Sequence, residues 1–247
     1  MRRLFRNIDW KRAAALGGIA FLVLILWDTR AVYPLKVLVV FFHEMSHGLA
    51  AIVTGGSVEE IQVVEEIGGV AWTRGGSRFL TLTAGYLGSL LWGGMILLYS
   101  ARTGWDKAGA AVIGAVLLGV TVWLVRPVGS FGFAFGVGTG VVLIASGVWL
   151  SNDINELVLR VIGLTSCLYA VYDIKSDILD RPEIRSDARM LADHTGVPTL
   201  VWGLIWIVIA LGAATVFVAL ASKRSRDSAY GVGSTRVGVS PSRAEDM

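Results

Sequence analysis

Charged residues are scarce in this chain. They make up 17% of its 247 residues, whereas they make up about 25% of a typical soluble domain. Hydrophobic residues reach 54%, and the mean hydropathy is +0.65. This composition excludes an ordinary soluble globular protein and indicates a polytopic membrane protein. We therefore expect the chain in the cell membrane, in contact with membrane lipids.

Two further scarcities restrict the chemistry. Cys167 is the only cysteine, which excludes an intrachain disulfide and a cysteine-ligated metal centre. It lies in an apolar run, where we expect it to pack as a small hydrophobic side chain. The net charge is only +3, and the basic residues lie at the termini and in short loops rather than along one face. We therefore expect no nucleic-acid partner.

The apolar residues form seven long runs, and about 20 apolar residues are needed to cross the hydrocarbon core. The predicted spans are residues 13–27, 35–54, 78–100, 108–125, 131–150, 155–173 and 199–221. No small-residue cleavage site follows the first run, so we expect it to be retained. The prediction is an all-α polytopic membrane protein with about six to seven transmembrane helices. Residues 1–221 form one membrane domain, and residues 222–247, rich in Ser, Gly and Arg, form a disordered tail.

Basic residues before the first span predict a cytoplasmic amino terminus. The spans at 35–54 and 155–173 then run from the outside toward the cytoplasm, so a site near their ends lies in the cytoplasmic half of the membrane. Seven spans also leave the carboxyl-terminal tail outside, although its basic residues favour the inside. Either two spans near residues 108–150 are miscounted, or the first helix does not cross.

The segment HEMSH, residues 43–47, lies within the second predicted span, where ionisable side chains are costly and usually serve a function. His43 and His47 are four residues apart, so on a helix they share one face within reach of a single ion. Glu44 lies about 100° round the helix and can reach a water on that ion. This spacing is typical of a zinc site whose glutamate is the general base. We predict one zinc ion, with His43 and His47 as ligands and Glu44 as the catalytic residue.

A catalytic zinc site needs a third protein ligand. The sixth predicted span ends in an acidic segment, where Asp173 and Asp177 are four residues apart on one helical face. We favour Asp173 as the third ligand because it lies deeper in the span, with Asp177 and Asp187 as alternatives. Asp173 and Asp177 are also suited to serve as interfacial caps or as salt-bridge partners of nearby basic residues.

With these residues, the sequence resembles the site-2 protease family of intramembrane zinc metalloproteases. HEMSH, followed by GLAAIVTGG, carries most of the resemblance, which covers about residues 34–175. Residues 58–76 alternate as short strands do, and members of that family carry a membrane-associated β-hairpin at this point. The next segment, LTAGYLGSLLWGG, is similar in place and in small residues to the family's Ala-Gly-Pro-x-x-Asn segment. The resemblance implies that Asp173 matches the aspartate of the family's Leu-Asp-Gly motif.

The sequence departs from that family at three points. Asp173 is flanked as Tyr-Asp-Ile, and Tyr86 and Ser89 stand where the family has Pro and Asn. No PDZ-like insertion is present, which is typical of a compact branch of peptidases resembling the family. The third ligand and the residues that handle the substrate are the parts of the site that these departures affect.

The resemblance implies an intramembrane zinc metalloprotease that hydrolyses peptide bonds of membrane-embedded protein substrates. Zinc would be held by His43, His47 and Asp173, and Glu44 would activate the water. A substrate helix must unwind locally before cleavage. The segment at 60–72 either pairs with that unwound strand by β-augmentation or forms a purely structural hairpin.

Two other functions stay open. One is a non-proteolytic zinc-binding scaffold or partner-binding protein, although a structural metal site has no need of Glu44 beside an open coordination position. The other is an ion-coupled transporter that uses the same ionisable residues. The sequence lacks the internal repeat that many transporters show, which makes this the third choice.

Overall fold

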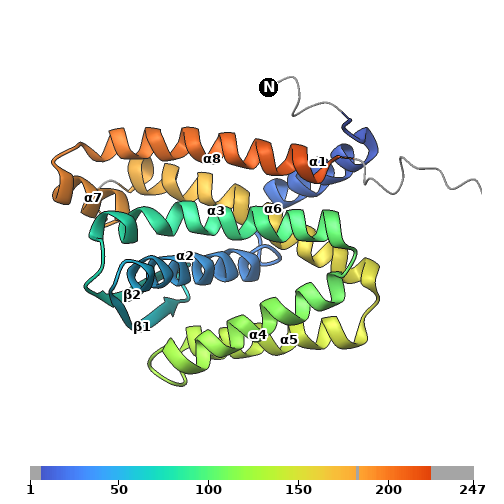
Figure 1. Cartoon of the computed structure of the whole chain (residues 1–247), viewed down its shortest axis with the longest axis horizontal. Coiled ribbons are helices and arrows are strands. Elements are labelled where there is room, and N and C mark those ends of the chain that lie inside the picture. Colours follow the sequence, from blue (N-terminus) through green and yellow to red (C-terminus); the bar gives the residue numbers. More distant parts are fainter. Residues whose placement is uncertain (1–6, 182–183, 224–247) are drawn as a thin grey trace, which may run out of the picture.

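Helices build almost all of this fold, and a small β-hairpin lies at one end of them (Figure 1). The computed structural model describes residues 7–181 and 184–223. The elements within these residues are α1 (Trp10–Ile25), α2 (Tyr33–Val53), β1 (Ser57–Val64), β2 (Gly68–Arg74), α3 (Arg78–Thr103), α4 (Asp106–Leu124), α5 (Phe131–Trp149), α6 (Asn152–Lys175), a π-helical turn (Ser176–Asp180), α7 (Asp187–Thr195) and α8 (Thr199–Ala221).

Six helices of the described chain are long and apolar enough to cross a membrane: α2, α3, α4, α5, α6 with the turn that follows it, and α8. The predicted all-α polytopic membrane fold with a hairpin after the HEMSH helix is therefore confirmed. The first predicted span is the exception, because α1 has only 16 residues and is not among the six. From residue 224 onward, the predicted disordered tail lies outside the described residues.

Polar side chains mark where several of these apolar helices begin. Ser77, Ser130 and Ser151 precede α3, α5 and α6, and each hydroxyl accepts a hydrogen bond from a backbone amide in the first turn. Such caps satisfy amides that have no partner within the helix. The short polar connections between the apolar runs therefore contain the signals that end one helix and start the next.

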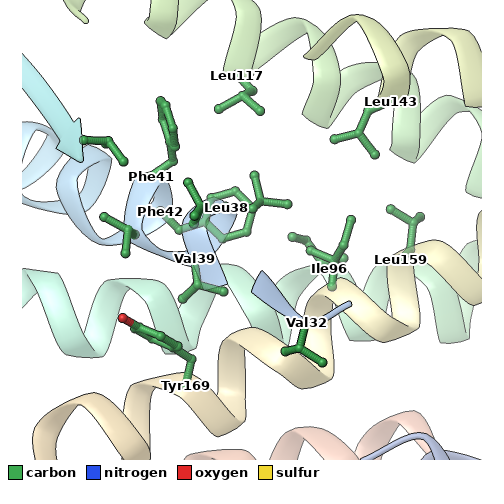
Figure 2. Packing of buried hydrophobic residues seen from close by; sticks show 14 of the residues in the cluster. Val32, Leu38, Val39, Phe41, Phe42, Ile96, Leu117, Leu143, Leu159 and Tyr169 are labelled. Carbon is green, nitrogen blue, oxygen red and sulfur yellow. The ribbon is translucent and has the colours of Figure 1, made fainter. Parts of the chain in front are cut away.

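The stretch of α2 that precedes HEMSH is buried on all sides. Residues 37–42 of α2 are each at most 5% exposed. Figure 2 shows them packed among side chains from four other helices: Ile96 of α3, Leu117 of α4, Leu143 of α5, and Leu159 and Tyr169 of α6. A helix surrounded in this way is apolar around its whole circumference. The ionisable residues that follow therefore lie inside the protein rather than against lipid.

Glycines let the helices approach closely. A Cβ atom added to Gly93 of α3 would lie 2.7 Å from the carbonyl oxygen of Gly163 of α6, and one added to Gly114 of α4 would lie 2.6 Å from that of Gly140 of α5. Contacts this short exclude any side chain at these positions. Gly140 of α5 thus serves close helix packing.

The hairpin is attached to the helices through its first strand. β1 pairs antiparallel with β2, and the backbone amide of Arg126, in the connection from α4 to α5, donates to the Ile61 carbonyl at 3.0 Å. Gly132 of α5 packs against Val63 of the same strand. The outer edge of β1 is thereby covered, and β2 is the edge strand of the described sheet.

The beginning and end of the described chain lie at one end of the helix bundle, and HEMSH lies toward the other (Figure 1). The amide of Asp9, just before α1, donates to the Ser222 carbonyl at 2.8 Å. Arg102, at the end of α3, donates to the Leu220 carbonyl. His47 instead contacts Thr81, at the start of α3.

This arrangement corrects two expectations. Seven complete crossings would put the two termini on opposite faces, whereas α1 starts beside the end of α8. The seventh crossing is therefore wrong, and of the two alternatives it is the first helix that does not cross, which leaves six spans within the predicted six to seven. The expectation that HEMSH approaches the face of the amino terminus is also wrong, since the motif lies toward the opposite end of α3.

Single introduced cysteines will test this arrangement. Thr103→Cys and Val128→Cys place an exposed thiol at opposite ends of the bundle, and the buried Cys167 leaves the parent protein as an unlabelled control. If the amino terminus is cytoplasmic, we expect a membrane-impermeant maleimide added to intact cells to label Val128→Cys and not Thr103→Cys. Labelling of both, or placement of Thr103 on the face opposite an amino-terminal tag, would contradict the six-span topology.

Candidate metal centre and active site

The HEMSH residues lie in the carboxyl-terminal half of α2, near the start of α3 and the hairpin. Glu44 is 4% exposed and His47 7%, and the His43 side chain is 12% exposed. The centroids of the two imidazole rings are 4.8 Å apart, with the ring planes nearly perpendicular. The predicted placement of both histidines on one helical face is therefore confirmed.

A carboxylate from a distant part of the chain joins the two histidines. Oδ2 of Asp187 lies 2.9 Å from Nε2 of His43 and 3.0 Å from Nε2 of His47. Asp187 occupies the first turn of α7, directly after the capping residue Ser186. The positive end of the helix dipole favours a carboxylate there. One ligand atom from each of the three residues lies within 4.8 Å of the other two, so together they can hold a metal ion.

Asp187 remains ionised in this setting. Burial alone would raise the pKa of its carboxyl group. The positive charge of protonated His47 and the hydrogen bonds with both histidines outweigh this effect and hold the pKa of Asp187 well below its usual range. A carboxylate that is already deprotonated at neutral pH is ready to bind a cation.

The two other predicted acids lie elsewhere. Oδ2 of Asp173, the favoured third ligand, is 3.7 Å from Nδ1 of His43, whereas Asp187 contacts Nε2 of the same ring. Asp177 accepts hydrogen bonds from the Tyr86 hydroxyl at 2.6 Å and from Arg181 at 2.8 Å. The structure therefore brings Asp187 to the two histidines and places Asp173 beside the other nitrogen of His43. The salt-bridge role considered for Asp177 is confirmed.

Backbone groups orient the second histidine. Nδ1 of His47 lies 2.7 Å from the Thr81 carbonyl oxygen of α3. Because a carbonyl only accepts hydrogen bonds, this contact places a proton on Nδ1, and when the ring is neutral Nε2 carries the lone pair that can bind a metal ion. No sequence pattern marks Thr81 for this role, since it acts through its backbone.

Gly85 leaves the space that the two rings occupy. A Cβ atom at this position would lie 2.3 Å from Nε2 of His43 and 2.6 Å from Cε1 of His47. Any side chain there would displace both imidazoles. The missing side chain of Gly85 therefore makes room for the two histidines.

A cavity of about 820 Å³ opens beside the group. Its lining includes all three potential ligands and Glu44, with β2 on the facing wall. A Cβ atom added to Gly69 of β2 would lie 2.6 Å from Oε1 of Glu44, so the strand passes directly over this carboxylate. Glu44 thus stands between the potential ligands and an extended stretch of backbone.

The free edge of β2 is directed toward this cavity. In an antiparallel pair, opposite residues alternate between exchanging hydrogen bonds with each other and pointing away from each other. The Ile61 carbonyl bonds to Arg126 outside the hairpin, so Ile61 and its partner Ala71 form a pair that points away. The same alternation applies to Val63 and Gly69. The backbone groups of Gly69 and Ala71 therefore point outward from the hairpin, and both residues line the cavity.

The donor set of the site fits zinc. Two imidazole nitrogens and one carboxylate oxygen are the ligands of many catalytic zinc sites, which keep the fourth position open. The structure brings together the same three donors: Nε2 of His43, Nε2 of His47 and Oδ2 of Asp187. The absence of a side chain at Gly85 leaves room for the two imidazoles.

Comparison with known proteins places the chain in a family. The family model described as peptidase M50B-like matches residues 16–217, most of the chain. No curated protein and no solved structure matches it. The family implies a metallopeptidase, and the six apolar helices indicate a multi-pass membrane protein. The identification from the sequence is thereby confirmed: the chain belongs to the peptidase M50B-like family, within the site-2 protease family.

Proposed function

We propose that the protein is an intramembrane zinc metalloprotease that cleaves peptide bonds of membrane-embedded protein substrates. His43, His47 and Asp187 hold one zinc ion, and Glu44 is the general base. The observation that carries the proposal is the convergence of three potential ligand atoms within 4.8 Å of one another, on the wall of the cavity that Glu44 also lines. Membership of the peptidase M50B-like family supports the reaction class.

The residues of the chain have distinct parts in the reaction. A zinc ion bound here would polarise the scissile carbonyl and lower the pKa of a water molecule toward about 7. Glu44 accepts the proton of the attacking water and delivers it to the leaving amine. Thr81 holds His47 in the orientation that binding requires. The burial of the site within the helix bundle keeps this chemistry away from lipid.

The hairpin is suited to hold the substrate. A transmembrane helix protects its amides by internal hydrogen bonds, so the scissile segment must be extended before water can attack. The outward-pointing backbone groups of Gly69 and the carbonyl of Ala71 offer such a segment new partners, as in β-augmentation, whereas the Ala71 amide already interacts with Glu44. Because β2 passes over Glu44, a strand paired with it would lie beside the base.

A zinc-binding scaffold protein is the alternative function, and an ion-coupled transporter is the third. A scaffold would need the three ligands but not the buried Glu44, whose desolvation is costly without a task. For a transporter, the group would need access to both faces, whereas the described cavity is lined by residues toward one end of the bundle. Both features favour the protease.

Replacing Glu44 separates catalysis from zinc binding. We expect Glu44→Gln to keep one zinc ion per chain and to lower the cleavage rate of a model transmembrane substrate in detergent by roughly 10²- to 10⁴-fold, the usual contribution of a general base. Asp187→Ala should bind zinc much more weakly and lose cleavage. Glu66→Gln, at an exposed position in the turn of the hairpin, is the matched control and should behave as the parent. Normal cleavage by Glu44→Gln would overturn its role as general base, whereas a zinc-loaded parent that cleaves nothing would instead support a binding function.

Adding one methyl group tests the space beside the rings. Gly85→Ala should abolish zinc binding, because the new Cβ atom would occupy the place of the His43 and His47 imidazoles. Gly119→Ala, on α4, meets no atom within 4 Å and should keep zinc, cleavage and thermal stability. Atomic absorption measures the zinc content of the two variants, and thermal unfolding shows whether each variant is folded. A Gly85→Ala protein with full zinc content would show that the ligands lie elsewhere.

Peptide inhibitors test the role of β2. An extended peptide that matches a cleaved substrate segment should inhibit cleavage competitively. Methylation of alternate backbone nitrogens removes the donors that pair with Gly69 and Ala71, and we expect it to weaken inhibition at least tenfold, about 1.4 kcal/mol. Methylation of the intervening nitrogens, which would point away from β2, is the control. Equal inhibition by both series would indicate a purely structural hairpin.

A further inference from the structure

The two histidines differ in what holds their second nitrogen. Nε2 of each ring faces Asp187, at 2.9 Å for His43 and 3.0 Å for His47. A neutral imidazole that binds a metal through Nε2 carries its proton on Nδ1, and that proton needs an acceptor. For His47 the acceptor is the Thr81 carbonyl.

For His43 the corresponding group is Asp173. Its Oδ2 lies 3.7 Å from Nδ1 of His43, and its side chain is 16% exposed. This distance is that of an ion pair and exceeds hydrogen-bond length, so the two groups must approach each other before Nδ1 can donate to the carboxylate. Tyr86 also contacts the His43 ring, edge to face, with centroids 5.0 Å apart. Asp173 and Tyr86 thus both restrict the orientation of His43.

The neighbouring acid is engaged with other partners. Asp177, one turn further along, accepts from Tyr86 and from Arg181. The contact that the structure gives Asp173 is the one with His43. Of these two acids, it is therefore Asp173 whose carboxylate is directed at the ring.

We infer that Asp173 is a positioning residue: its carboxylate accepts the Nδ1 proton of His43 and aims Nε2 at the metal, while Asp187 provides the third ligand. This inference rests on the proposed function, since it assigns a part in the same site. Carboxylates that bind the far nitrogen of a ligand histidine fix its tautomer and raise its basicity. The carboxylate that matches the family aspartate in sequence thus acts through His43 rather than on the metal.

Zinc affinity and the number of zinc ligands distinguish an acid that binds the metal directly from an acid that positions His43. At saturating zinc, we expect Asp173→Ala to bind one ion per chain with the same number of protein ligands by X-ray absorption, and with an affinity 10- to 100-fold lower in competition with a chelator. Asp173→Asn should recover part of this loss, because its amide oxygen accepts the same proton. Asp187→Ala should lose a ligand. Asp180→Ala, at an exposed position that pairs with Lys175, is the control and should keep the parent affinity.

Each other outcome overturns the inference. If Asp173→Ala loses a ligand while Asp187→Ala keeps the full set, Asp173 is itself the third ligand. If Asp173→Ala binds zinc as tightly as the parent, Asp173 does not position His43. Thermal unfolding of the zinc-free variants shows that they are folded. Failure of the proposed function would look different, because His43→Ala and His47→Ala would then bind zinc as the parent does.

Discussion

The burial of α2 by four other helices and the hairpin is the constraint on which the rest of the structure depends. It takes the ionisable residues of HEMSH out of contact with lipid and leaves them largely buried beside the cavity. In such surroundings a polar group without a partner costs several kcal/mol. Each nitrogen of the two imidazoles accordingly faces an oxygen atom: Thr81, Asp173 and Asp187 supply them. The neighbouring helices must therefore supply an oxygen atom at each position that faces an imidazole nitrogen of α2.

Those partners come from three directions. Thr81 is on α3, Asp173 on α6, and Asp187 on α7, so the site holds together elements that are far apart in the chain. Gly85 lets α3 approach the two rings closely, and the cap at Ser186 starts α7 where its first turn meets them. Packing and chemistry therefore depend on the same few positions. A change in helix packing near Gly85 is also a change in the geometry of the potential ligands.

The hairpin links the site to the α4–α5 pair. Arg126 and Gly132 anchor β1, and this leaves the edge of β2 free on the cavity side. A free edge strand is ordinarily a liability, since it can pair with other chains. Here the edge lies over Glu44, where pairing with an extended segment would place that segment beside this carboxylate. The bond from Arg126 to Ile61 thus decides which strand of the hairpin stays available.

The sequence by itself determined the features that depend on neighbouring residues. The spacing of His43, Glu44 and His47 predicts their relative placement because a helix repeats every 3.6 residues. The apolar runs predict six of the helices, and the alternation after HEMSH predicts the hairpin. Each of these follows from local geometry that a few consecutive residues specify.

Only the tertiary structure decided which acid meets the histidines. Asp187 is 144 residues from His43, and its distance to the ring depends on how α2, α3, α6 and α7 pack together. Depth along a helix favoured Asp173, but depth does not say which nitrogen a carboxylate will face. The same reason applies to Thr81, which acts through its backbone, and to the end of the bundle toward which HEMSH lies. Whether α1 completes a crossing depends on where its ends pack, which the hydropathy of its residues does not specify.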